Sequence, residues 1–273
     1  MPDEAPVPPG IDASTPNAAR MYNYYLGGKD NFAVDRAAAE QVLKVAPEAR
    51  ELARQNRAFL RRALQHVMAE TGIRQFIDIG TGLPSEGNVH EIVHARDPDA
   101  SIVYVDNDPV VLAHARAILS RTSSTATIRG DLRRPIDILN NPELRDLIDF
   151  SQPVAILLVA VLHFLTDDDK PGEVIARLRD SLAPGSHLIL SHVTADERAY
   201  AAQQGAAVYR KASASITLRH RQQIMELFDG FELIPPGLVR LHDWRPDEDS
   251  AFATYRGREL PTWFYCGVGR IRD

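Results

Sequence analysis

Residues 76–88 read FIDIGTGLPSEGN, a short β-rich run that ends in glycine and continues into a loop with a second glycine. Gly80 and Gly82 would let backbone amides approach a ligand closely, because glycine adopts conformations closed to other residues. Ligands of α/β proteins bind at the carboxyl edge of the sheet, where such a loop lies. The stretch therefore predicts the first strand of an α/β sheet with a binding site at its end.

The chain that follows continues the alternation of strand and helix. Four more β-rich runs are separated by helical stretches such as 109–121 and 170–183; the runs are 101–108, 125–131, 154–161 and 186–193. Strands that alternate with amphipathic helices indicate βαβ units in a parallel sheet covered on both faces, with right-handed crossovers. A helix opening at Thr217 and two final strands, at 231–241 and 262–271, would complete a seven-stranded Rossmann-like sheet.

The segment before the first strand has a different character. Residues 1–16 hold five prolines and little to bury, which predicts a flexible arm. Residues 33–71 place apolar side chains at helical spacing, with Gly72 as the expected C-cap. We therefore expect three parts: the arm at 1–16, a helical lid or cap at 17–72, and the sheet domain at 73–273.

Composition narrows the class of protein. The net charge is −6, from 31 Lys and Arg against 37 Asp and Glu, so the basic excess typical of a nucleic-acid binder is missing. Cys266 is the single cysteine, so no intramolecular disulfide can form, which fits a reducing compartment. No apolar run is long enough to span a bilayer. We expect a cytoplasmic protein that binds neither nucleic acid nor membrane.

Two classes of cofactor use a glycine loop of this kind. A dinucleotide fingerprint would have a third glycine where this chain has Ser85, and Asp78 would lie unfavourably near an anionic pyrophosphate. The same acid suits a ligand with a cationic amine, such as the methionine end of S-adenosylmethionine. The loop permits both classes and favours the methyl donor.

The ends of the next two strands supply further acids. Asp106 follows the second strand, where a carboxylate can accept both ribose hydroxyls, while Asp108 is expected to cap the helix opened by Pro109. The alternative is that Asp106 is itself the cap. Asp131 follows the third strand and could accept from an adenine amino group, with Leu132 against the ring, or could form only a turn.

Together these acids and glycines resemble the class I S-adenosylmethionine-dependent methyltransferases. The stretches PNAARMYNYYLGGKDNFAVDR (16–36), FIDIGTGLP (76–84), GNVHE (87–91), YVDNDPVVLAHARAIL (104–119) and LSHVT (190–194) are similar to one family of these enzymes, named S-adenosyl methyltransferases, with largely unassigned substrates. The resemblance implies strand order 3-2-1-4-5-7-6 with the last strand antiparallel. It also implies a donor site that Thr81, Asn107 and Val161 complete.

The segment after the fourth strand, LVAVLHFLTDDD (158–169), should border the transferable methyl group. His163 is the candidate base there, and the alternative is that it only packs beneath the cofactor. His192 is a second, weaker candidate. Asp167, Asp168 and Asp169 are expected to cap the following helix rather than to bind a metal ion. Residues 192–213 should form part of the wall around a small-molecule acceptor.

The N-terminal stretch MYNYYLGGKDNF (21–32) is the remaining unusual feature. The rings of Tyr22 and Tyr25 could cover a sulfonium through cation–π attraction, with a tight turn at 27–28. Lys29 could meet the donor's carboxylate, and Asp30 could cap the next helix. We interpret Tyr22, Tyr25, Gly27, Gly28 and Lys29 as a lid over the donor; the alternative is plain packing. Deleting residues 1–32 should then weaken donor affinity at least about tenfold.

The leading hypothesis is an S-adenosylmethionine-dependent methyltransferase with a small-molecule acceptor. A protein that binds the donor without turnover is one alternative, since no base stands out in the sequence. An NAD(P)-dependent oxidoreductase is another, since the glycine loop permits it. The acceptor, the kind of atom methylated and the oligomeric state are left open.

Overall fold

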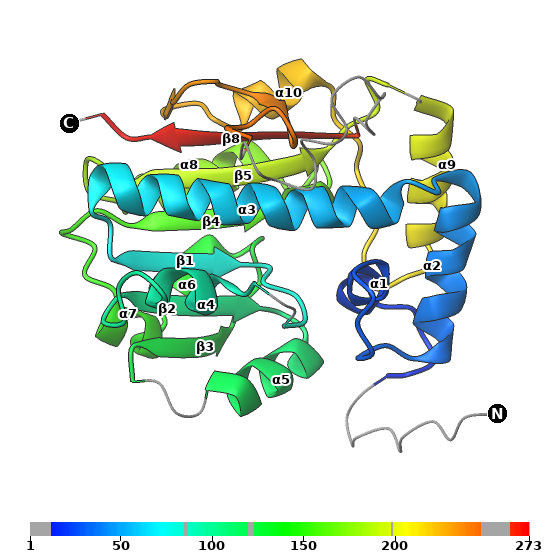
Figure 1. Ribbon diagram of the computed structural model, residues 1–273, viewed down its shortest axis with the longest axis horizontal. Helices are drawn as coiled ribbons and strands as arrows, with labels where there is room; N and C mark the ends of the chain where they lie inside the picture. The colour runs from blue at the N-terminus through cyan, green and yellow to red at the C-terminus, as the bar shows by residue number, and fades with distance from the viewer. Residues whose placement is uncertain (1–11, 85–86, 120–122, 198, 247–262, 273) are drawn as a thin grey trace.

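The computed structural model describes residues 12–84, 87–119, 123–197, 199–246 and 263–272. A mostly parallel sheet forms its centre, with helices on both faces (Figure 1). The strands are β1 (Gln75–Ile79), β2 (Ser101–Asp106), β3 (Thr125–Arg129), β4 (Ala155–Val159), β5 (His187–Val193), β6 (Glu232–Leu233), β7 (Val239–Arg240) and β8 (Phe264–Arg270). The helices are α1 (Ala18–Tyr25), α2 (Ala33–Val45), α3 (Ala49–Thr71), α4 (Val89–His94), α5 (Pro109–Leu119), α6 (Pro135–Leu139), α7 (Pro142–Leu147), the 3₁₀ turn η1 (Leu162–Phe164), α8 (Pro171–Arg179), α9 (Ala199–Tyr209) and α10 (Arg221–Glu226).

The strand order is β3-β2-β1-β4-β5-β8-β6, and β7 also pairs with β8. The first five strands run parallel, and β8 is antiparallel to β5, β6 and β7. This confirms the expected order 3-2-1-4-5-7-6, with β8 as its antiparallel seventh strand. The expected strand at 231–241 is divided into β6 and β7 by Pro235, Pro236 and Gly237, since proline has no amide hydrogen for a ladder.

Alternation along the strands produces a core on each face of the sheet. In β1, Ile77 and Ile79 belong to the core beneath α6, α7, α8 and α10. Phe76 faces the other side, where α3 and α4 cover the sheet and Phe59 packs edge-on against the buried ring of Trp244. Figure 1 shows α3 running across this second face. Burial on both faces is what a parallel sheet requires.

A third layer lies beyond the carboxyl ends of the parallel strands, where α1, α2 and α9 pack together (Figure 1). Its apolar core combines early residues such as Met21 and Tyr25 with late ones such as Val193 and Tyr209. A buried ion pair joins Arg20 of α1 to the carboxylate of Asp35 in α2, with an N–O distance of 2.7 Å. This layer, which we call the cap (α1, α2 and α9), stands over the edge at which ligands bind in α/β folds.

Three expected helix ends can be compared with the structure. Gly72 ends α3 in the left-handed conformation, with φ +68°, as expected for a C-cap. Asp30 does not cap α2, because the amide of Phe32 donates to the carboxylate of Asp35 instead. Thr217 is not the N-cap of α10, which begins at Arg221 after His220.

Some of the features expected from the sequence lie in residues that the structure does not describe. Residues 1–11 of the expected arm and Ser85 and Glu86 of the glycine loop lie outside the described residues. Within the described ranges, no helix combines the length and the apolar character that crossing a membrane requires.

Candidate functional site

A cleft of about 630 Å³ lies at the carboxyl edge of the sheet, between the loops that follow β1 to β4 and the start of α1. Seven expected donor-binding residues line it: Gly80, Gly82, Asp106, Asn107, Asp131, Leu132 and Val161. Residues that the sequence did not single out line it as well: Asn17, Arg20, Arg133, Phe164 and Ser213. We call this space the donor cleft.

The glycine loop forms the floor of the donor cleft. Gly80 has φ +76°, and a Cβ there would lie 2.2 Å from Cγ2 of Val161. Gly82 has φ +66°. Residues other than glycine are strained in this backbone region. The loop therefore presents bare backbone to the cleft, as close approach to a ligand requires.

Asp106 is held at the end of β2 by backbone donors. The amide of Gly82 donates to its Oδ2 and the amide of Asp108 to its Oδ1, each at 2.9 Å. Burial raises the pKa of Asp106, and these amide hydrogens oppose the rise. Asp108 caps α5, since its Oδ1 accepts from the amide of Val110. The cap expected at Asp108 is confirmed, and the carboxylate of Asp106 is oriented with lone pairs left for a ligand.

Asp131 forms the expected turn and also lines the donor cleft. Its Oδ1 accepts from the amide of Arg133 at 3.0 Å, which is the expected turn, and its carboxylate also pairs with the Arg133 guanidinium. The Arg133 side chain holds the pKa of Asp131 below its usual range. Leu132 is buried beside it. The residue lines the donor cleft, with its charge already neutralised by a neighbour.

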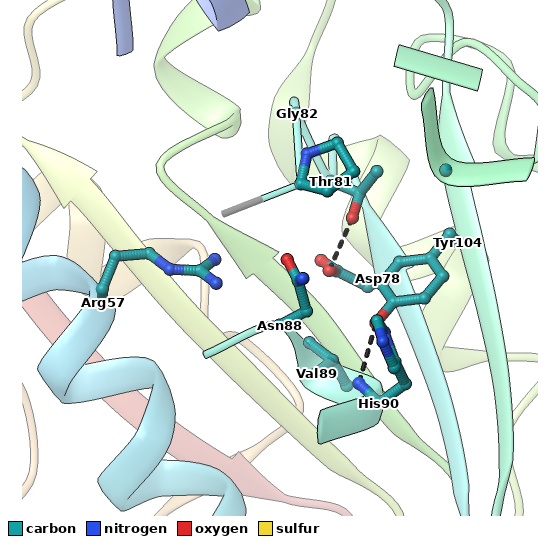
Figure 2. A pocket seen from close by; sticks show the side chains of 10 residues that line it. Arg57, Asp78, Thr81, Gly82, Asn88, Val89, His90 and Tyr104 are labelled. Carbon is teal, nitrogen blue, oxygen red and sulfur yellow. Dashed lines mark hydrogen bonds between the residues drawn. The ribbon is translucent and has the colours of Figure 1, made fainter. Parts of the chain in front are cut away.

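A smaller cavity adjoins the glycine loop and contains Asp78 and Thr81 (Figure 2). The Thr81 hydroxyl donates to Oδ2 of Asp78 at 2.8 Å. Burial raises the pKa of Asp78 to about 6, against the opposing effects of the Thr81 hydrogen bond and the charge of Arg57. Figure 2 shows Arg57 reaching from α3 toward Asp78 and Asn88. Sequence reasoning missed Arg57, because it lies on a helix well before the glycine loop and no local pattern marks it.

Three carboxylates thus stand at the ends of three successive strands around a glycine cradle. Asp106 is positioned for a diol, and Asp78 offers a buried negative charge with Arg57 opposite it. A ligand that carries a ribose at one point and both an ammonium and a carboxylate at another matches this order of groups.

Comparison with known proteins bears directly on this arrangement. Residues 4–272 match the family described as S-adenosyl methyltransferase.

The chain belongs to the S-adenosyl methyltransferase family.

The two solved structures that follow belong to close relatives. A DUF574 family protein from Streptomyces avermitilis MA-4680 is 37% identical, with 95% of this chain and 99% of that chain covered and a TM-score of 0.90. A protein of Thermobifida fusca YX, provisionally described as a methyltransferase, is 40% identical, with 99% and 100% covered and a TM-score of 0.90. No curated protein matches the chain.

Membership of the S-adenosyl methyltransferase family decides between the two cofactor classes that the glycine loop permits. The chain is an S-adenosylmethionine-dependent methyltransferase, and S-adenosylmethionine is its methyl donor. A Haloferax volcanii methyltransferase solved with its Trm112 activator is only 16% identical at a TM-score of 0.50, a likeness of fold alone.

In this S-adenosyl methyltransferase, His163 lies in η1, directly after β4. It is buried, and its Nδ1 has no hydrogen-bond partner among the described residues. Burial lowers the pKa of His163 well below 6.5, and the neighbouring His192 and Arg219 lower it further. The imidazole is therefore neutral and keeps a lone pair available to accept a proton.

His192 is different, because both of its ring nitrogens are engaged. Nδ1 lies 2.6 Å from the carbonyl of Val193, and Nε2 lies 3.0 Å from Nη1 of Arg219. A guanidinium can only donate, so Nε2 accepts and Nδ1 carries the hydrogen. Burial lowers the pKa of His192 to about 3. Its role as a second base is wrong on this geometry, since no lone pair is left for a substrate proton.

Arg219 also fixes the segment that carries His163. Its guanidinium donates to the carbonyls of Leu162 and Leu165 and pairs with Asp167 at 2.8 Å. Asp169 closes a turn by accepting from the amide and hydroxyl of Thr166. The expectation that the three acids cap α8 is therefore wrong: Asp167 and Asp169 organise the loop before it, and the N-cap of α8, Lys170, makes no side-chain capping bond.

The N-terminal stretch approaches the cleft differently from the sequence-based interpretation. The N-cap and first turn of α1, just before that stretch, line the donor cleft, and Nδ2 of Asn17 donates to Oδ2 of Asp108 at 2.5 Å. Gly27 and Gly28 form the turn after α1, and Lys29 is exposed. Tyr22 and Tyr25 line a second cavity described below rather than the donor cleft.

Proposed function

We propose that this enzyme transfers the methyl group of S-adenosylmethionine to a small-molecule acceptor held beneath the cap. The observation that supports the proposal is a second cavity of about 140 Å³, which we call the acceptor cavity. It shares Ala18, Ala19, Ala160 and Phe164 with the donor cleft, so the two spaces adjoin. A cavity of this size between packed helices suits a small molecule rather than a macromolecular chain.

The donor's nucleoside end is proposed to lie over the ends of β2 and β3. Asp106 would accept the ribose hydroxyls with the lone pairs that its amide donors leave. Asp131 would accept from the adenine amino group, with Leu132 and Val161 against the ring faces and Asn107 beside them. The Arg133 side chain that now pairs with Asp131 is more than half exposed, so it can move aside at small cost.

The donor's methionine end is proposed to point toward the smaller cavity of Figure 2. Asp78, oriented by Thr81, would meet the ammonium group, and the guanidinium of Arg57 would meet the carboxylate. Arg57 donates one hydrogen bond to the carbonyl of Gly87, and its Nε has no partner among the described residues. A planar guanidinium is suited to bind a carboxylate through two parallel hydrogen bonds.

The bound donor supplies an already activated methyl group, so the protein's part is to position the acceptor, exclude water and, where needed, take up a proton. We propose that α1 and α2 act as the lid, through Asn17 and Arg20 at the donor and through Tyr22 and Tyr25 at the acceptor. His163 is the group placed to take the proton.

Isothermal calorimetry with S-adenosylhomocysteine tests the donor site. Replacing Asp106 by asparagine should raise the dissociation constant about 10- to 100-fold, since hydrogen bonds to a charged group contribute about 1.5–3 kcal/mol. Asp149→Asn is the matched control, because this exposed residue contacts Gln75 at the amino end of β1, away from the cleft. Equal affinity in the two variants would contradict the proposed contact.

A further inference from the structure

The acceptor cavity is built almost entirely from apolar and small side chains. Alanines of α1, α3 and α9, together with Ala46 just after α2, form much of its wall, which is closed by Phe164 and Trp263. None of the described residues that line it is Asp, Glu, Lys or Arg. The hydroxyls of Tyr22 and Tyr209 are directed to protein partners, the first to the carbonyl of Ala53 and the second to Tyr25. The wall therefore offers a ligand contact area and no compensating charge.

The size of the acceptor cavity sets the size of what can enter it. Its volume is about 140 Å³. An apolar cavity of about 150 Å³ in another protein holds one benzene ring. The four lining residues that it shares with the donor cleft place it next to the methyl donor. The acceptor cavity therefore has room for a single ring with a short substituent.

The absence of charge among the lining residues selects against charged acceptors. A carboxylate or an aliphatic ammonium would lose its hydration on entering and find no counter-ion there. An aliphatic amine would have to enter as its minor neutral form at neutral pH. A hydroxyl group enters uncharged, so it loses less hydration free energy than a charged group does. Its proton still needs an acceptor at the moment of reaction.

His163 supplies that acceptor. It lines the cavity, is 5% exposed, and its imidazole is neutral. A buried neutral imidazole is a weak base, so it matches a hydroxyl that is itself acidic, such as a phenol or an enol, better than an aliphatic alcohol.

Resting on the proposed methyl transfer, we infer that the acceptor is an uncharged, single-ring molecule with a phenolic or enolic hydroxyl, and that methylation occurs on oxygen. The acceptor oxygen forms a bond to the methyl carbon while the carbon–sulfur bond breaks, and that electron pair stays on sulfur. The hydroxyl proton passes to the neutral imidazole of His163. The products are a methyl ether, S-adenosylhomocysteine and a protonated imidazole that releases its proton to solvent.

Three phenols of similar size test the inference: 4-ethylphenol, 4-hydroxyphenylacetate and tyramine share a nucleophile and differ in charge. Calorimetry measures their binding to the enzyme saturated with S-adenosylhomocysteine, and transfer of labelled methyl measures kcat/KM. We expect 4-ethylphenol to bind and to be methylated on oxygen. We expect both charged compounds to be at least about tenfold worse in Kd and in kcat/KM.

Two variants extend the test. Gly205→Ala adds one methyl group to the cavity wall, 3.8 Å from Cγ1 of Val42, inside a helix that alanine favours. It should raise Kd and KM for 4-ethylphenol more than for phenol and leave S-adenosylhomocysteine affinity unchanged. His163→Gln should lower kcat for 4-ethylphenol about 100-fold or more, with KM within about threefold.

The outcomes separate the inference from the function on which it rests. If S-adenosylhomocysteine binds but 4-ethylphenol does not, or if a charged phenol reacts as well, the inferred acceptor class is wrong while the methyltransferase stands. If S-adenosylhomocysteine itself does not bind, the proposed function fails. Full kcat in His163→Gln would overturn the role of the imidazole.

Discussion

Replacing Asp78 by asparagine should stabilise the unliganded enzyme and weaken donor binding at the same time. Asp78 is only 7% exposed, and burial raises the pKa of its carboxyl from 3.8 to about 6. The folded chain therefore holds this proton more tightly than the unfolded chain does. Burying the ionised carboxylate therefore lowers the free energy of unfolding, and the neutral asparagine amide of the variant avoids that loss.

The size of the cost follows from the shift in pKa. A difference of about two units, at about 1.4 kcal/mol per unit, makes the charge cost about 3 kcal/mol at neutral pH. An asparagine amide loses some hydration of its own on burial, which reduces the expected gain to about 1–3 kcal/mol. Because the folded pKa is the higher one, the cost is complete above about pH 6 and vanishes below about pH 4.

Urea unfolding followed by circular dichroism, at pH 7.5 and again in acid, measures this difference in wild type and Asp78→Asn. We expect the variant to have the higher midpoint at pH 7.5 and the two midpoints to converge in acid. Calorimetry on the same samples should show S-adenosylhomocysteine affinity lowered at least about tenfold, through loss of the contact with the ammonium group. A variant that is less stable at pH 7.5, or a difference that persists in acid, would refute the reasoning.

Four further substitutions probe the glycine loop and the lid. Gly80→Ala should lower the free energy of unfolding by about 2–4 kcal/mol in urea titrations, through positive φ and steric overlap. Gly87→Ala is the control, because this residue has the same φ of +76° but nothing within 4 Å of the added methyl group; it should lower the free energy of unfolding by only about 1–2 kcal/mol. An equal loss of stability in the two variants would contradict the steric overlap at Gly80. Asn17→Ala removes a helix cap and the contact to Asp108, and should weaken S-adenosylhomocysteine binding about fivefold by calorimetry. Lys29→Ala should leave that affinity within about twofold, because the side chain is exposed; a larger loss would restore Lys29 to the donor site.

The parts of the molecule that sequence predicts well are those governed by local pattern. Alternating strands and helices define the sheet, and strand ends place Gly80, Asp106 and Asp131 at one edge. Asp108 could be identified as a cap because capping depends on residues only a few positions away. The division of the expected sixth strand into β6 and β7 could also have been predicted, since two prolines and a glycine interrupt it.

The parts that sequence could not place depend on packing between distant segments. Arg57 reaches the methionine end of the site only because α3 crosses the sheet, and Ser213 reaches the donor cleft only because α9 folds back over it. The same holds for His192, whose sequence position suggests a base until Arg219, 27 residues away, is seen to occupy its lone pair. In the N-terminal stretch, one helix carries Asn17 to the donor and Tyr22 to the acceptor cavity, a division that no local motif encodes.

The cap also determines when the enzyme can be complete during synthesis. Its apolar core joins residues near 21–25 to partners at 193–209 and to Trp263. The ribosome releases the N-terminal helices first, yet the surfaces that cover them are among the last to be made. For most of translation α1 and α2 therefore lack α9 as a partner, and their apolar faces stay open to chaperones or to premature contacts. The acceptor cavity closes only after Trp263 has emerged, so a nascent chain can pair its first five strands long before it can hold a substrate.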